Sequence, residues 1–412
     1  MARLLPMGVQ HVVAMFGATV LAPILMGFNP QVALFFSGIG TIIFLTLTRF
    51  RVPSYLGSSF AFIGPVLAVT GGDASRISHA SFGIAGAAVL YAIAGLATIR
   101  FGARWIERLM PPVVTGTVVA LIGLNLASSS LTNALNDKFT LATSADAHKV
   151  LVAAVTFLVA GAVAVYLRGF LRLLPILTGV LVGYALAAAT GQLDPEAIAR
   201  IGAAPWVGLP PLHLPTPDAG ALLVICPVFV VLVAENKGHI AAISGYMRRD
   251  LNPLLGRAYL GDAIATFVSA VGGGTPQTTY AENMGVMAIT RVYSISNFLM
   301  AALVAMLLGV CPKFGAVILS IPTPVLGGVT LILYGLITLM GVKIWLDAKV
   351  DFADQRNLVV AGSSLVVATG LGVKGVTIGS VNIAGIAVGT MLALALNLVL
   401  SIGRGARDVT AA

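Results

Sequence analysis

Charged side chains are scarce in this sequence of 412 residues. Only 9% of its residues are charged, 58% are apolar, and the mean hydropathy is +0.99. Charged residues make up about a quarter of an ordinary soluble domain, so 24 basic and 15 acidic side chains are too few to cover a soluble protein of this length. Disordered chains are excluded as well, because they are polar and rich in charge. The composition therefore predicts a polytopic membrane protein.

Cysteine is nearly absent. Cys226 and Cys311 both lie inside apolar runs, so the sequence predicts neither a disulfide framework nor a metal cluster. The phosphate loop of ATP-driven pumps, the His-Glu-x-x-His zinc motif and the Gly-x-Ser-x-Gly nucleophile elbow are also missing. We therefore expect a protein that is not an enzyme, binds no metal and uses no cofactor. Although the net charge is +9, the basic residues are dispersed singly, so nucleic acid is not an expected partner; such an excess usually reports orientation in the membrane.

Long apolar segments make up most of the chain, and they fall into two sets of seven. The first set lies near 7–27, 30–48, 53–70, 80–99, 111–128, 148–167 and 173–191. The second lies near 220–243, 254–271, 275–290, 295–312, 324–342, 357–373 and 383–403. A polar stretch between the sets, Gln192–Asp218, has the composition of a linker. The first segment follows the start of the chain without a small-residue cleavage site, so we interpret it as a transmembrane helix and not as a signal peptide.

The distribution of Lys and Arg predicts the orientation. With the N-terminus in the cytoplasm, 17 of the 24 basic residues lie on the cytoplasmic side, six lie outside, and Lys237 falls within a span. This bias follows the positive-inside rule, so both termini are expected in the cytoplasm. Because seven is odd, the second set enters the membrane with the opposite orientation. The sequence therefore predicts two inverted repeats, a plan that recurs among secondary transporters.

The third segment of each set is interrupted. Pro53–Pro65 and Gly272–Gly285 combine glycine, proline and hydroxyl residues where a spanning helix should be uniformly apolar. Non-helical backbone at membrane depth persists only where protein or a cavity satisfies its polar groups. Interruptions at corresponding positions of two halves are typical of a transporter binding site, although small residues also occur at ordinary helix contacts.

Three acidic residues, Glu235, Asp262 and Glu282, fall within predicted spans. Placing an acid at the membrane centre costs about 2.5–3.5 kcal/mol on insertion scales, so such residues face a cavity, a partner or a proton path. A carboxylate accepts hydrogen bonds from the N–H groups of a neutral solute, and a desolvated carboxyl group can bind and release a proton. We therefore expect Glu235 and Glu282 to be functional, whereas Asp262 fits either a functional or a structural role.

Three further polar residues fall in or near predicted spans, and two of them, Lys237 and His239, are close to Glu235 in the sequence. His239 is four residues further on and shares its helix face. Lys237 is a poor direct partner, because residues two positions apart do not face each other on a helix. His11, near the start of the first span, fits a polar network better than a ligand site.

Several segments resemble one transporter family. Glu282–Arg291 matches the signature of the nucleobase–ascorbate transporter family, also called nucleobase:cation symporter-2. Gln10–Thr19, Tyr55–Phe62, Trp105–Pro112, Glu235–His239 and Thr278–Asn283 are similar to bacterial uracil and pyrimidine permeases. These matches occur in order over nearly the whole chain. The sequence departs from the family pattern at Ala281, where close uracil permeases have glycine, at Asn236 and at Lys237.

The resemblance implies an all-α membrane protein of fourteen spans in two inverted repeats, with short extended segments in spans 3 and 10. It implies a core domain and a gate domain, whose first halves are 1–110 (spans 1–4) and 111–192 (spans 5–7). Residues 193–218 form a periplasmic linker, and the second halves are 219–312 (spans 8–11) and 313–404 (spans 12–14). A homodimer through the gate domains is also implied.

The resemblance further implies site residues. The implied substrate-binding residues are Phe60, Glu235, Tyr280, Ala281 and Glu282. Glu282 is the implied proton-coupling residue, with Glu235 and His239 close to it. Ser59, Lys237, Asp262, Asn283 and Tyr334 are expected to support the site, Tyr334 from the gate side.

These expectations describe a proton-coupled importer of uracil or a closely related pyrimidine, multi-pass in the cell inner membrane. Its partners are the nucleobase and the lipid bilayer, and protons are the coupling ion. A purine (xanthine or urate) symporter of the same family is the first alternative. An anion transporter on the same seven-plus-seven plan is the second, but such a protein needs a cationic site where this sequence places acids. A channel is the third.

Overall fold

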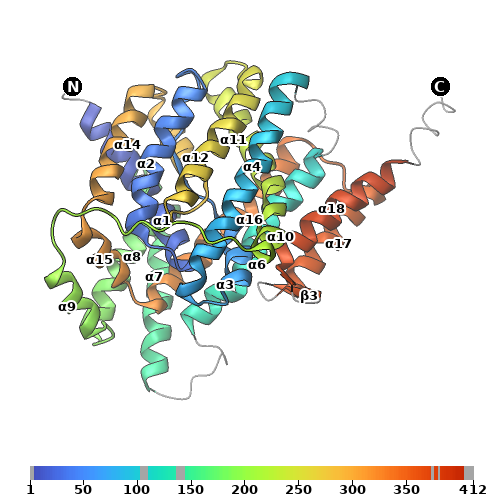
Figure 1. Cartoon of the computed structure of the whole chain (residues 1–412). Coiled ribbons are helices and arrows are strands. Elements are labelled where there is room, and N and C mark those ends of the chain that lie inside the picture. Colours follow the sequence, from blue (N-terminus) through green and yellow to red (C-terminus); the bar gives the residue numbers. More distant parts are fainter. Residues whose placement is uncertain (1–3, 103–109, 136–143, 373–374, 379–380, 403–412) are drawn as a thin grey trace.

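The computed structural model describes residues 4–102, 110–135, 144–372, 375–378 and 381–402, which are mostly helical (Figure 1). Some sequence expectations lie outside these residues. They are most of the Trp105–Pro112 match and seven of the basic residues used for the orientation, Arg3, Arg104, Arg108, Lys138, Lys374, Arg404 and Arg407.

The first half of the described chain contains eight α-helices. They are α1 (Leu4–Met26), α2 (Pro30–Leu47), α3 (Ile63–Thr70), α4 (Ile77–Phe101), α6 (Pro112–Ala134), α7 (Ser144–Tyr166), α8 (Pro175–Ala189) and α9 (Pro195–Ala203). Short 3-10 turns are η1 (Phe60–Phe62), η2 (Ala74–Arg76) and η3 (Gly169–Leu173), and one strand, β1, covers Leu56–Ser58.

The second half of the described chain contains nine α-helices. Its helices are α10 (Ala219–Ile225), α11 (Phe229–Met247), α12 (Leu255–Val271), α13 (Ala281–Thr290), α14 (Ile295–Gly309), α15 (Pro312–Leu319), α16 (Thr323–Asp347), α17 (Gln355–Leu371) and α18 (Gly385–Ile402). The 3-10 turns are η4 (Cys226–Val228) and η5 (Asn252–Leu254), and the strands are β2 (Gln277–Thr279), β3 (Val376–Ile378) and β4 (Val381–Ile383).

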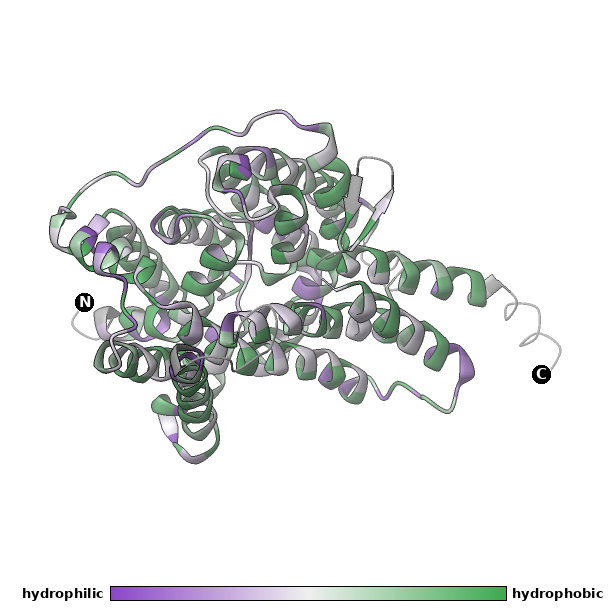
Figure 2. Cartoon of the chain, turned by 90° about the horizontal axis from the view of Figure 1, so that it is seen from below, coloured by the Kyte–Doolittle hydropathy of each residue, from purple (hydrophilic) through white to green (hydrophobic). Residues whose placement is uncertain are grey.

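All fourteen predicted segments contain helix, the third and tenth also contain a strand, and the segment near 220–243 is divided into α10, η4 and α11. Within the described residues, eight helices are long and apolar enough to cross a membrane, or nine if α14 and α15, bent by 81°, form one span. Hydrophobic residues cover most of the helical ribbon, and hydrophilic residues concentrate in the connections (Figure 2). The chain is therefore a multi-pass membrane protein.

Helix packing divides these elements into two groups. In one group α4 packs on α12, α12 on α2, and α14 on α1 and α2. In the other group α6 packs on α16, α17 and α18, while α7 packs on α8 and α16. The interrupted spans, β1 with α3 and β2 with α13, lie in the first group, and Tyr334 lies on α16 in the second.

The polar stretch between the halves contains more structure than the sequence analysis predicted. Asp194 accepts a hydrogen bond from the Glu196 N–H (3.0 Å) and Pro195 occupies the first turn, so α9 begins there. Asp and Pro at these two positions are a strong helix-start signal. Residues 193–218 are thus a linker that includes a helix.

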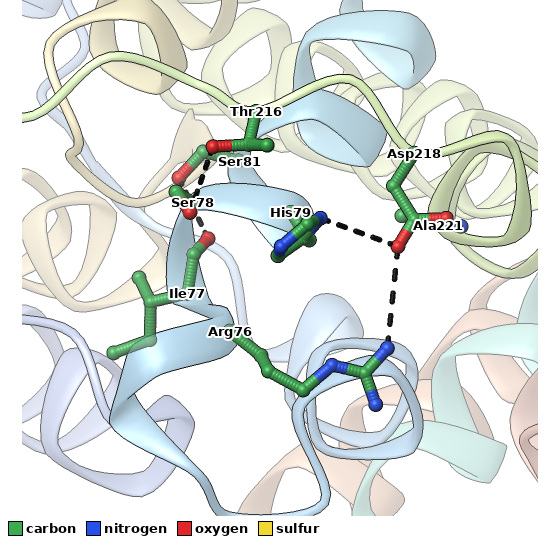
Figure 3. A network of polar contacts seen from close by, with 8 residues as sticks. All are labelled: Arg76, Ile77, Ser78, His79, Ser81, Thr216, Asp218 and Ala221. Atoms are coloured by element: carbon green, nitrogen blue, oxygen red, sulfur yellow. Dashed lines mark hydrogen bonds and ion pairs between the residues drawn. The ribbon is translucent and has the colours of Figure 1, made fainter.

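The end of this linker is fixed to the start of α4 (Figure 3). Asp218 accepts a hydrogen bond from the Ala221 N–H (3.1 Å) and so begins α10. Its carboxylate also lies 3.4 Å from His79 and 4.0 Å from Arg76. The backbone N–H of Thr216 donates to Ser78 O at 3.0 Å. Figure 3 shows that Asp218 joins α10 to the beginning of α4.

Candidate substrate site

The two interrupted spans meet in a short antiparallel pair of strands. Leu56 pairs with Thr279, Gly57 with Thr278, and Ser58 with Gln277. All six residues are buried. The prediction of short extended segments in the third and tenth segments is therefore confirmed.

Threonines from neighbouring helices bind the outer edges of this strand pair. The Leu56 N–H donates to Thr41 Oγ1 on α2 at 2.9 Å. The Gln277 N–H donates to Thr266 Oγ1 on α12 at 3.0 Å, and the same hydroxyl donates to Gln277 O at 3.0 Å. Buried non-helical backbone thus finds its hydrogen-bond partners in the protein, as membrane depth requires.

Helices begin directly after the two strands. Phe60 opens η1, which runs into α3, and Ala281 opens α13, with Glu282 in its first turn. Because the strands are antiparallel, α3 and α13 leave their meeting point in opposite directions. Both helix starts therefore lie beside the strand pair. Amide groups of a first helical turn have no partner within the helix, and the start of α13 has no side-chain cap.

Glu235 approaches this point from α11. Its carboxyl group lies beside the hydroxyl groups of Ser59 and Thr278 and within electrostatic range of Glu282. The Oε2 atom of Glu235 is buried and has no hydrogen-bond partner among the described residues. Ser59 Oγ and Thr278 Oγ1 are likewise buried without a partner there. The structure thus brings the two predicted glutamates together at the helix starts.

Aromatic side chains enclose the same region. The rings of Phe60 and Tyr334 meet edge to face, with centroids 6.4 Å apart. The Tyr334 hydroxyl is buried without a hydrogen-bond partner among the described residues. Tyr280 is 3% exposed, and its hydroxyl donates to Ser58 O at 2.9 Å. Tyr334 is the residue that approaches from the second helix group.

A second set of polar contacts holds the elements that carry the site. Asn236 donates a short hydrogen bond to Asp262, which joins α11 to α12. His239 Nδ1 lies 2.7 Å from Thr279 Oγ1, which joins α11 to β2. Asn283 Nδ2 lies 3.1 Å from His11 Nδ1, which joins α13 to α1. Asp262 and Asn283 therefore contact side chains that join the elements carrying the two glutamates to α12 and α1.

Sequence reasoning missed some of these contacts. Asn236 was noted only as a departure from the family pattern, yet it is the hydrogen-bond partner of Asp262. Thr278 was noted only within a matching segment, although its hydroxyl faces Glu235.

Two residues that depart from the family pattern lie on the elements of the site. Lys237 is half-buried on α11, and Ala281 is half-buried at the start of α13. Across the described residues no group of His, Cys, Asp or Glu could hold a metal ion.

Comparisons with known proteins show which family the sequence resembles. Residues 2–379 match the model of a family described as "Permease family". The Escherichia coli (strain K12) protein RutG, which is named as a pyrimidine permease, is 45% identical over 403 residues, covering 96% of this chain and 89% of that protein. A uracil permease of Bacillus caldolyticus is 40% identical over 406 residues, covering 96% of this chain and 91% of that protein.

Solved structures share the fold at low sequence identity. The transmembrane domain of the cyanobacterial bicarbonate transporter BicA superposes with a TM-score of 0.65 at 16% identity, covering 96% of each chain. The murine solute carrier 26 family member A9 anion transporter, in its inward-facing state, gives a TM-score of 0.69 at 13% identity, covering 98% of this chain and 69% of that one. Such identities establish the fold alone.

The family match spans most of the chain, and the relatives exceed one third identity over nearly their whole length. Because the matching proteins are permeases, this protein is a transporter and not an enzyme. The chain therefore belongs to this permease family, the nucleobase–ascorbate transporter family that the signature Glu282–Arg291 indicated.

Proposed function

We propose that this protein imports uracil or a closely related pyrimidine base together with protons. In this proposal it lies in a cell inner membrane with both termini in the cytoplasm. The observation that carries the proposal is the pair of acids, Glu235 and Glu282, beside the paired strands. The names of the relatives, pyrimidine permease and uracil permease, support the choice of base.

The chemistry of the site suits a small planar base. A pyrimidine base presents ring N–H donors and carbonyl acceptors along its edges. Oxygens of the two carboxyl groups can accept the N–H groups, and a protonated carboxyl group keeps this capacity. The uncapped amides that open α13 can donate to a carbonyl oxygen. Phe60, Tyr280 and Tyr334 supply aromatic surface for the ring. In this role Ala281 brings backbone close to the base.

Glu282 is the proposed proton carrier. In the outward-facing protein a protonated Glu282 helps to form the site, and its deprotonation on the cytoplasmic side releases the base. Glu235 lies close to Glu282, so ionising both carboxyl groups at once has an electrostatic cost. His239 and Asp262 connect the elements around this pair. Protons are the coupling ion, and the proposed cycle uses no cofactor.

The proposed architecture has fourteen spans in two inverted repeats. The group with α1–α4 and α10–α14 acts as the core, and the group with α6–α8 and α16–α18 acts as the gate. Movement of the core against the gate exposes the site to each side in turn. The two gates of a homodimer are proposed to contact each other.

Two alternative transport functions can be distinguished from this proposal. A purine symporter of the same family differs only in the base, so competition between bases distinguishes it. An anion transporter is suggested by the fold of the two solved structures, but an anion needs positive charge, whereas this site contains two acids.

Uptake of labelled uracil into proteoliposomes tests the proposal. We expect accumulation that requires an inward proton gradient, collapses with a protonophore and is blocked by unlabelled uracil or thymine. Neither xanthine nor urate should compete. Competition by xanthine alone would replace the pyrimidine with a purine, and uptake that neither saturates nor accumulates would indicate a channel.

A further inference from the structure

The two interrupted spans carry glycines at equivalent positions. Gly64 on α3 and Gly285 on α13 lie the same number of residues beyond the ends of β1 and β2. Each glycine therefore occupies the same place on its half-helix. Each one also faces a connection between two helices of the gate group, and the two connections are different.

At α3 the facing residues open α18. A β-carbon placed on Gly64 would lie 3.5 Å from Asn125 Oδ1 on α6, 3.7 Å from Ala384 Cβ and 3.7 Å from Ile386 Cγ2. Ala384 and Ile386 are buried, at 0% and 3% exposure. Ala384 follows β4 directly, Ile386 lies in the first turn of α18, and α3 also contacts β4 itself. We call the contact of Gly64 with Ala384 and Ile386 the α3 seal.

At α13 the facing residue lies in the connection from α7 to α8. A β-carbon on Gly285 would lie 3.3 Å from Leu173 Cδ2, tighter than an ordinary contact. Leu173 ends η3, and η3 packs on α13. We call the contact of Gly285 with Leu173 the α13 seal.

The two seals have corresponding positions in the two halves of the chain. In the proposed inverted repeat, the α7–α8 connection joins spans 6 and 7, and the α17–α18 connection joins spans 13 and 14. Each connection packs on the interrupted span of the opposite half. Since α3 and α13 leave the strand pair in opposite directions, the seals lie on opposite sides of the candidate site.

We propose that the α3 seal and the α13 seal are the two barriers that open in alternation during transport. This inference deepens the proposed function and rests on its transport cycle. An apolar side chain meets the glycine at both contacts, and apolar constrictions close a pore by drying it. Both contacts are present in this structure. Transport then requires each glycine to separate from its partner once in every cycle.

Cysteine bridges test this directly. Cys226 and Cys311 are first replaced by serine, and Gly64→Cys is combined with Ala384→Cys. The 3.7 Å between the β-carbons lies within the range of about 3.5–4.5 Å found in disulfides. The second pair is Gly285→Cys with Leu173→Cys, bridged by oxidation or by a short bifunctional thiol reagent. The four single-cysteine proteins are the matched controls, because they carry each substitution without a bridge.

If the seals are barriers, either bridge lowers the initial rate of uracil uptake by about tenfold or more, because it blocks an obligatory gating step. Reduction of the disulfide restores the rate, and the bridged protein still binds uracil. A protein bridged at either seal that transports as fast as its reduced form overturns the proposal. If the protein with Gly285→Cys and Leu173→Cys does not fold, the protein with Gly64→Cys and Ala384→Cys is sufficient to overturn the proposal.

The rates of bridging provide an independent result. Opening one seal should accompany closing of the other, so an imposed proton gradient changes the two bridging rates in opposite directions. A change in the same direction for both pairs contradicts alternation. This measurement needs no substrate. If the reduced double-cysteine proteins and the parent take up no uracil, uracil is not the substrate and the proposed function is wrong. The two bridging rates still show in that case whether the seals open in alternation.

Discussion

The ring of Tyr280 lies against the backbone of Gly57, and a β-carbon at Gly57 would collide with its Cζ and Cε2 atoms. The Tyr280 hydroxyl donates to the carbonyl of the next residue, Ser58, at 2.9 Å. Tyr280, which follows β2, is therefore held against β1 by two contacts: its ring packs on Gly57, and its hydroxyl bonds to Ser58. Glycine at position 57 lets β1 and the segment after β2 approach this closely.

We predict that Gly57→Ala destabilises the protein by about 1–3 kcal/mol, the usual cost of overpacking a filled core, and lowers uptake. The Tyr280 ring is 3% exposed, so it is not free to swing out into solvent. Thermal unfolding of the detergent-solubilised protein measures the change. Gly362→Ala on α17 is the control, since a β-carbon there meets nothing within 4 Å. Equal unfolding temperatures for the two variants would contradict the tight contact.

A second prediction concerns the hydrogen bond between Asn236 and Asp262. Asn236→Leu leaves a fully buried carboxyl group without this donor, so we expect a loss of stability of about 1–3 kcal/mol. Replacing both residues with leucine removes the orphaned group, so the double variant should lose less than the two single losses added together. Unfolding measurements on all four proteins complete the cycle. Strictly additive losses would mean that the bond contributes nothing to stability.

A third prediction concerns pH and the linker. His213 packs on Gly273, where a β-carbon would collide with the imidazole ring. Burial lowers the pKa of His213 below its usual value of about 6.5. The detached linker therefore binds a proton more readily than the packed one. Attachment should be strongest above this usual value and should weaken as the pH falls through it towards the lowered pKa.

Limited proteolysis of the linker in liposomes measures this attachment. Cleavage of the parent should accelerate between about pH 7.5 and about pH 5.5, relative to His213→Gln at each pH. Asp218, His79 and Arg76, which fix the end of the linker, are common to both proteins. The comparison therefore isolates His213. A constant ratio between parent and variant across this range would rule out a role for its protonation.

The sequence predicted those features that depend on local composition. Glycine, proline and hydroxyl residues in Pro53–Pro65 and Gly272–Gly285 marked the two interruptions, because such residues weaken a helix wherever they occur. Glu235 and Glu282 were identified because an acid in an apolar segment requires an explanation. Their proximity could not be derived from composition, since it depends on how α11 and α13 are rotated against the strand pair.

The contacts that were missed have a common cause. Asn236 meets Asp262 across two helices, and spacing along the chain cannot fix their relative rotation. The hairpin of β3 and β4 is a different case. Two short runs rich in β-branched residues, Val376–Ile378 and Val381–Ile383, flank Gly379-Ser380, and this pattern is a hairpin signal. It was concealed within a connection between two apolar segments.

The most direct test of the account compares Glu282→Gln with the parent in proteoliposomes. The amide keeps the shape of the side chain but cannot carry the proton. We predict that Glu282→Gln remains folded by size-exclusion chromatography, yet no longer accumulates uracil under an inward proton gradient. Glu196→Gln, on exposed α9, should accumulate uracil like the parent. Proton-driven accumulation retained by Glu282→Gln would contradict the account and would move the coupling role to Glu235 or Asp262.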